Sequence, residues 1–250
     1  MRPTLPAPGC ATEAVLPINC FSEETLERHF DIEIDQLKDQ LLLMAGRAES
    51  IVQKSIQALA RRDQPLAEEV FEDDHVIDRQ EIELEERCLE LLARHQPLAR
   101  DLRFITATLK ISNDLERIGD HAVNIAGSTL KLLQEPPLKP LVDIPRMAEL
   151  ATGMLREALD AFVRRDAGGA RHLVRRDDEV DQLNDQVFRE LISFMIENPR
   201  TITRAMELIL VARNLERVAD LATNVAEEVV FITEARIIKH HAEDSEFGRS

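Results

Sequence analysis

The sequence has no tryptophan, no tyrosine and only eight glycines among 250 residues. Aromatic residues make up 4% of the chain, whereas β-strands are enriched in aromatic and β-branched residues. An apolar content of 44% is sufficient for a core, and charged residues make up a further 31%. The composition is rich in leucine, alanine, glutamate and arginine, which favour helices, so it predicts long helices and disfavours sheets.

Other absences exclude whole classes of partner. No run of about 18 apolar residues is present, which argues against a membrane-spanning helix, and the opening residues lack the apolar block of a secretory signal. A formal charge of −16 disfavours binding to a phosphate backbone, and few aromatic rings are available to stack on bases. We therefore expect no nucleic-acid partner, and contact with a membrane only peripherally, through partner proteins.

Cysteine is scarce as well. Cys10, Cys20 and Cys88 show neither metal-ligand spacing nor a disulfide framework, which favours the reducing environment of the cytoplasm. Cys88 falls within a helical pattern, and we interpret it as a small apolar residue of the core.

What is present is helical periodicity interrupted by proline. Residues 1–22 carry four prolines without periodicity and are interpreted as a flexible tail. Three helical patterns follow, separated at Pro65 and Pro97, before the stretch "QEPPLKP" at 134–140, which is interpreted as a linker. Three more follow, and the second of these is expected to run unbroken from the "RRDAGG" turn to Glu197.

The sequence therefore predicts an all-α fold, in which six helices form two tandem, internally repeated three-helix bundles. We expect each bundle to bury a core of its own. The expected units are a flexible N-terminal tail at 1–22, a first bundle at 23–135, a second bundle at 141–240 and a C-terminal tail at 241–250.

Specific sequence motifs of the first half recur in the second. "LERIGDHAVNIA" at 115–126 recurs as "LERVADLATNVA" at 215–226, and "RRD" at 61–63 recurs at 164–166. Residues four apart lie one above another on a helix, so each repeat stacks a Glu, an Asp and an Asn into one column. These columns consist of Glu116, Asp120 and Asn124, and of Glu216, Asp220 and Asn224. Like charges at this spacing cost an isolated helix about 0.2–0.5 kcal/mol, which a bound cation would offset.

The direction of the first column can be inferred from its helix. We interpret the arc of Lys110, Asp114, Arg117 and His121 as the solvent face. Glu116 and Asp120 lie outside both this arc and the main apolar stripe, so we expect them to face a groove beside another helix.

The preceding helix supplies matching acids. Asp78 lies 19 residues before Pro97 and Glu116 lies 19 residues after it, and Asp74 and Asp120 are both 23 residues away. Antiparallel helices of equal rise would therefore bring these four carboxylates to the same level. In the second half Asp177 and Asp181 match Asp220 and Glu216 within one residue.

Clustered carboxylates form a hard oxygen site for a metal ion. The predicted ligands are Asp74, Asp78, Glu116, Asp120, Asp177, Asp181, Glu216 and Asp220, with Asn124 and Asn224 as possible additional ligands. Arg117 and Arg217 directly follow the Glu of each column. They are expected to hold a carboxylate or an anion near the metal. Magnesium, manganese, iron, zinc and calcium all remain open as the ion.

Two alternatives remain open. The same carboxylates could serve a metal-dependent enzyme, although no general base is evident beyond the ligands, and no phosphate-binding loop or nucleophile motif is present. The acidic faces could also be solvated on a purely structural helical scaffold. His75, which forms the single Glu-x-x-His pair with Glu72, is interpreted as a surface residue.

Three stretches of the sequence resemble the PhoU family of phosphate transport regulators. They are "HFDIEIDQLKDQLLLMA" at 29–45, "HQPLARDLRFITATLKISNDLERIGDHAVNIA" at 95–126 and "ARNLERVADLATNVAEEVVF" at 212–231. The resemblance extends over about residues 24–240, and both acidic signatures match in residue type and spacing.

The resemblance implies two similar three-helix bundles that bind metal ions at the Glu/Asp-x-x-x-Asp signatures. It also implies a cytoplasmic, homodimeric and non-enzymatic protein. Such a protein would be a negative regulator of phosphate-starvation signalling and an adaptor between the ATPase subunit of a phosphate transporter and a sensor histidine kinase.

Overall fold

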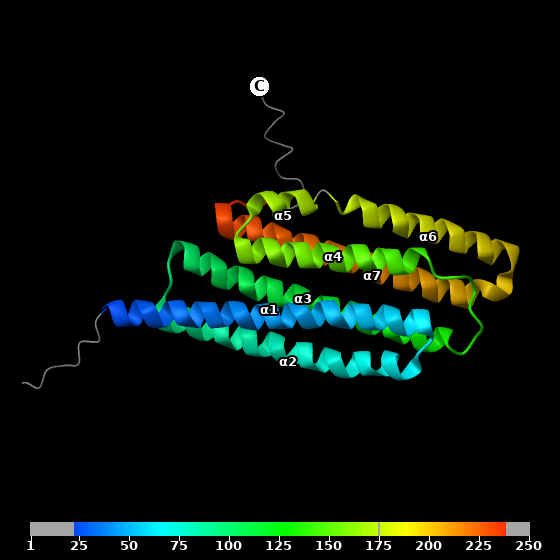
Figure 1. The fold of residues 1–250 in the computed structure, drawn as a ribbon, viewed down its shortest axis with the longest axis horizontal. Helices are drawn as coiled ribbons and strands as arrows, with labels where there is room; N and C mark the ends of the chain where they lie inside the picture. The colour runs from blue at the N-terminus through cyan, green and yellow to red at the C-terminus, as the bar shows by residue number, and fades with distance from the viewer. Residues whose placement is uncertain (1–22, 175, 239–250) are drawn as a thin grey trace, which may run out of the picture.

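The computed structural model describes residues 23–174 and 176–238, and every regular element in these ranges is helical. The elements are α1 (Glu23–Arg61), α2 (Gln64–His95), α3 (Ala99–Leu132), α4 (Asp143–Arg164), α5 (Ala167–Val174), α6 (Asp178–Glu197), the 3-10 helix η1 (Pro199–Thr201) and α7 (Ile202–Glu234) (Figure 1). The predicted all-α class is confirmed. Both predicted tails, 1–22 and 241–250, lie outside the described residues.

The repeated "RRD" forms the same turn in both halves. Arg62 and Arg165 both adopt the left-handed conformation, each with φ of 55°, directly after the helices α1 and α4. The following aspartate then caps the next helix: Asp63 Oδ1 accepts from the backbone N–H of Leu66 at 3.1 Å, and Asp166 Oδ1 accepts from that of Gly169 at 2.9 Å. A left-handed residue that ends one helix, followed by a capping aspartate, reverses the chain within a few residues.

The prediction of one unbroken helix up to Glu197 is wrong. The chain leaves the helix after Val174, and α6 begins at Asp178, so α5 and α6 together occupy the fifth of the six helical positions. The first turn of α6 carries Asp178, Glu179 and Asp181. Acidic residues stabilise a helix N-terminus through the helix dipole, so this run favours the start of a helix over a helix interior.

Two central helices join the halves. α3 and α7 make the most extensive contact between any two elements, and α1 packs beside α4 over them. α2 lies against α1 and α3 in the first half, while α5 and α6 lie against α4 and α7 in the second (Figure 1). The acidic repeats are on α3 and α7, so the two halves are in contact along the helices that carry the predicted site.

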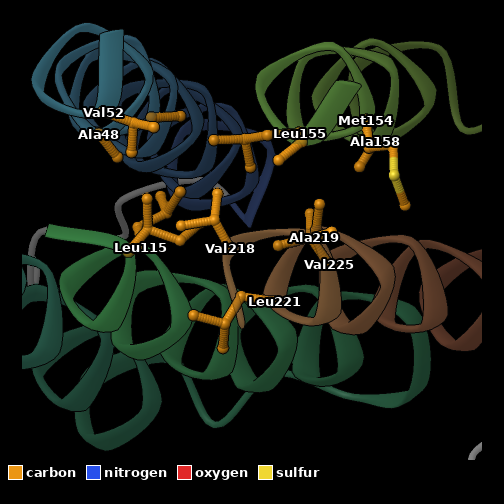
Figure 2. Close-up of a cluster of buried hydrophobic side chains, with 14 of the residues drawn as sticks. Ala48, Val52, Leu115, Met154, Leu155, Ala158, Val218, Ala219, Leu221 and Val225 are labelled. Atoms are coloured by element: carbon orange, nitrogen blue, oxygen red, sulfur yellow. The ribbon is translucent and has the colours of Figure 1, made fainter. Parts of the chain in front are cut away.

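The buried side chains form one continuous cluster that draws on both halves, so the core of each bundle is continuous with that of the other. Figure 2 shows Ala48 and Val52 of α1 and Leu155 of α4 lying over Leu115 of α3 and Val218 of α7. Leu115 and Val218 are fully buried. The division of the chain into a unit at 23–135 and a unit at 141–240 stays a prediction.

The face of α3 predicted to meet solvent is exposed at Lys110 and Arg117 but also contacts α7. Lys110 Nζ lies 3.0 Å from Glu228 Oε1, and His121 Nδ1 lies 2.9 Å from Asn214 Oδ1. Asp114, from the same arc, is 9% exposed. The prediction is wrong for Asp114 and His121, because the periodicity of one helix indicates polarity but cannot reveal that a polar face has a polar partner.

The described residues bear on two smaller expectations. Cys88 is fully buried, and burial, followed by the nearby Glu85 charge, raises the pKa of its thiol to about 12, which agrees with its interpretation as a core residue. None of the helices in this part of the chain has the length and apolarity needed to cross a membrane. Cys10 and Cys20 lie outside the described residues.

Candidate metal centres

Four carboxylates of the first half lie on α2 and α3, close enough to influence one another electrostatically. This first centre consists of Asp74 and Asp78 on α2 and of Glu116 and Asp120 on α3. Burial, and then the negative charges of Asp78 and Asp120, raise the pKa of Asp74 to about 6. The pKa of Glu116 is raised by burial and then by Asp120 and Asp78. The carboxylates that were level-matched across Pro97 therefore influence one another electrostatically, and their joint role as ligands of one ion stays a prediction.

The second half repeats the arrangement with one difference. This second centre consists of Asp177, Asp181, Glu216 and Asp220. Burial, and then Asp220 and Asp181, raise the pKa of Asp177 to about 6. The pKa of Glu216 is raised by burial and then by Asp220 and Asp181. Asp177 lies in the turn before α6, whereas its counterpart Asp74 lies inside the unbroken helix α2.

One carboxylate oxygen in each centre lacks a partner. Asp74 Oδ1 and Asp177 Oδ1 are both buried, and neither has a hydrogen-bond partner among the described residues. Asp74 as a whole is only 9% exposed. A buried polar atom normally finds a partner, and an ionised carboxylate without one is costly, so each oxygen has the character expected of a metal ligand. The two atoms occupy equivalent positions of the two centres, and four further buried side-chain atoms among the described residues also lack a hydrogen-bond partner.

The other predicted residues are placed less uniformly. Asn124 is exposed and Asn224 is half-buried, one helical turn beyond the carboxylates, and their role as ligands stays a prediction. Arg217 Nη1 lies 3.6 Å from Asp220 Oδ2 in its own centre. Arg117 Nη1 instead lies 3.4 Å from Asp114 Oδ1, on the face of α3 that meets α7. The two arginines that match in sequence therefore differ in their surroundings.

His75 is a neighbour of the first centre that the sequence interpretation placed at the surface. Its ring is largely exposed, but a ring nitrogen and carboxylate oxygens of Asp74 and Asp78 lie within 4.8 Å of one another. His75 Nδ1 lies 3.6 Å from Asp78 Oδ2. Its position next to Asp74 in "DDHVID" was the available signal. An imidazole nitrogen beside hard oxygen ligands would favour manganese, iron or zinc over calcium or magnesium.

Gly119 also supports the first centre, and the sequence interpretation did not identify it. A Cβ atom at this position would stand 2.6 Å from Asp74 Oδ1, so the bare backbone of α3 allows that carboxylate to approach. The second half has Ala219 at the corresponding place in the repeat. Gly119 therefore keeps this space open at a cost of about 1 kcal/mol in helix propensity relative to alanine.

We expect Gly119→Ala to displace the Asp74 carboxylate and weaken metal binding at the first centre about tenfold, with little loss of thermal stability, because the helix gains about 0.5–1 kcal/mol of propensity. Calorimetric titration with Mn²⁺ and thermal melting test this. The matched control is Gly127→Ala on the same helix, where a Cβ would meet nothing within 4 Å. Equal metal affinity in the two variants would contradict the assigned role of Gly119.

The fold and the two centres define a class of protein: a duplicated helical bundle with a carboxylate-rich centre between two helices of each half. The family model described as the PhoU domain matches the chain twice, at residues 41–129 and 144–229. The chain belongs to the PhoU family.

Known proteins are similar to this one over most of its length. A phosphate-specific transport system accessory protein PhoU homolog of Aquifex aeolicus is 42% identical over 208 residues, which is 83% of this chain and 94% of the relative. The protein of the same description in Caulobacter vibrioides is 42% identical over 211 residues, covering 84% and 91%. The crystal structure of PhoU from Pseudomonas aeruginosa is similar with a TM-score of 0.80 and 37% identity, covering 83% of this chain and all of the other.

Proposed function

We propose that this chain is a metal-binding regulator of phosphate uptake and a negative regulator of phosphate-starvation signalling. In this proposal it acts in the cytoplasm as a homodimeric adaptor between the ATPase subunit of a phosphate transporter and a sensor histidine kinase, and it catalyses no reaction. The names of its relatives, which are accessory proteins of a phosphate-specific transport system, support the connection with phosphate transport.

The observation that carries the metal-binding part is the pair of orphaned buried oxygens, Asp74 Oδ1 and Asp177 Oδ1, at equivalent positions of the two centres. A divalent or trivalent cation would provide a partner for each oxygen and would neutralise the surrounding carboxylates. Neutralised carboxylates no longer repel across the groove, so the ion would tie α2 to α3 and α6 to α7. The bundle would then present a fixed helical surface to its partners.

Calorimetric titration with Mn²⁺ and Mg²⁺ tests the metal binding. We expect the variant Asp120→Ala/Asp220→Ala to lose most of the binding heat, because each substitution removes a ligand from one centre. The matched control is Asp35→Ala/Asp39→Ala, which removes the same charge from an exposed pair four residues apart on α1. Equal binding heats in the variant, the control and the wild type would contradict metal binding at these carboxylates and would favour the purely structural helical scaffold.

The adaptor part is tested with the same three proteins. Each tagged chain is recovered from phosphate-replete and from phosphate-starved cells, and the transporter ATPase subunit and the sensor kinase are quantified by antibody. We expect the wild type and the α1 control to recover both proteins, and the Asp120→Ala/Asp220→Ala variant to recover several-fold less. Failure of the wild type to recover either protein in both conditions would overturn the adaptor function, and metal-dependent hydrolysis of phosphate esters would favour an enzyme.

A further inference from the structure

A cavity of about 270 Å³ lies where the linker at 134–140 leads from α3 to α4. α1 ends and α7 begins at this same end of the molecule (Figure 1). The walls are mostly aliphatic, because five leucines from both halves and the linker line the cavity: Leu59, Leu132, Leu138, Leu141 and Leu208. None of the lining residues belongs to the two candidate metal centres.

Side chains from both halves hold the linker in place over this cavity. Arg62 Nη2 donates to three backbone oxygens at the end of α3 and the start of the linker, at 3.2, 3.0 and 2.7 Å. From α7, Arg204 Nη1 donates to the backbone oxygen of Pro136 at 2.9 Å. Three of the seven linker residues are prolines, whose rings fix φ. The cavity is therefore formed without a ligand, as is usual for small-molecule sites.

Two cations line the cavity, and they differ in their partners. Lys139 pairs with the carboxylates of Glu190 and Asp143. Arg62 forms no ion pair with a carboxylate of the described residues, and its three carbonyl partners carry only partial charges. All three contacts use Nη2, so within the described part of the chain Nη1 and Nε have no acceptor. The cavity thus combines an aliphatic wall with a guanidinium that can still bind an anion.

We propose that this cavity binds a small carboxylate with an aliphatic body, whose carboxylate pairs with Arg62 and whose chain packs against the leucines. A planar guanidinium matches the geometry of a carboxylate through two parallel N–H donors. A cavity of about 150 Å³ accommodates benzene, so this one has room for about ten non-hydrogen atoms, which is the size of octanoate. A molecule bound here would contact α1, α3, the linker and α7 at once.

Calorimetric titration of the full chain with octanoate, and with the uncharged octanol, tests the site. We expect Arg62→Gln to weaken octanoate binding about tenfold or more, because it removes a charge-assisted contact, and to change octanol binding by less than about twofold. The matched control is Arg165→Gln, because Arg165 adopts the same left-handed conformation in the equivalent turn of the second half. It should leave the binding of both probes unchanged.

Leu141→Trp tests the cavity without altering Arg62. The larger side chain fills the space, so octanoate binding should be lost, whereas Val142→Trp at the adjacent exposed residue should leave it intact. Thermal melting confirms that both variants are folded. Three results would each overturn the proposal: no saturable octanoate binding to the wild type at millimolar concentration, equal octanoate binding by the two Trp variants, or an equal loss of octanoate and octanol binding in Arg62→Gln.

Discussion

In the presence of a metal chelator at pH 7.5, we expect the variant Asp74→Asn/Asp177→Asn to be more stable than the wild type. Its free energy of unfolding should be about 2–4 kcal/mol higher. Burial and neighbouring carboxylates raise the pKa of both groups from 3.8 to about 6 in the folded protein. A shift of about 2 units corresponds to about 3 kcal/mol, and the contribution of the more exposed Asp177 is reduced by solvent screening. Asparagine keeps the shape and removes the charge.

The pH dependence has a definite sign. Between about pH 4 and pH 6 the folded protein holds protons on Asp74 and Asp177 that the unfolded chain has released. The stability contributed by these groups therefore falls as the pH rises through that window. The stability difference between variant and wild type should be small at pH 4 and fully developed at pH 7.5. Denaturant unfolding at several pH values measures it.

Asp35→Asn/Asp39→Asn on α1 is the control for this prediction, because it removes the same charge from exposed positions. It should change the stability by a few tenths of a kcal/mol, as expected for an acidic pair at this spacing. The idea that the two ionised carboxylates destabilise the folded protein would be contradicted if the Asp74→Asn/Asp177→Asn variant were as stable as the wild type at pH 7.5. It would also be contradicted if the stability difference were the same at every pH. Added Mn²⁺ should reverse the order, because it stabilises only a protein that binds it.

Leu115→Ala is expected to lower the free energy of unfolding by about 2–5 kcal/mol, the range for a large core residue truncated to alanine. Leu115 is fully buried in α3 and lies near Val218 of α7, so the cavity opens where the two halves meet (Figure 2). Because the core is continuous, both halves should unfold together and both should be destabilised.

The chain has no tryptophan, so single reporters can be placed in each half. Leu89→Trp on α2 and Phe188→Trp on α6 are suitable, since both side chains are about half exposed. We expect both reporters to show one transition at the same denaturant concentration, shifted equally by Leu115→Ala. Leu98→Ala, at a residue that is 81% exposed, should change stability by less than about 0.5 kcal/mol. Separate transitions for the two reporters would contradict the single core.

The sequence predicted most of the helices and the grouping of the carboxylates because both depend on short-range geometry. Pro97 and the equal rise of two antiparallel helices brought Asp78 level with Glu116 and Asp74 level with Asp120. Gly119 was visible in the sequence, but its contact with Asp74 depends on the distance between α2 and α3, which periodicity does not give. His75 adjoins Asp74 on α2 and could have been grouped with it from the sequence. The break before α6 was missed because a proline-free acidic run was counted as helix interior.

By itself, the sequence determined the helical class, the duplication, the turns and the pairing of helices within each hairpin. Only the tertiary structure decided that α3 and α7 contact each other through pairs of polar side chains and that the two halves share one core. The physical reason is the separation along the chain between the residues that interact. Turns and hairpin levels follow from neighbouring residues and a fixed rise, whereas contact between residues about 100 positions apart depends on how complete bundles pack against each other.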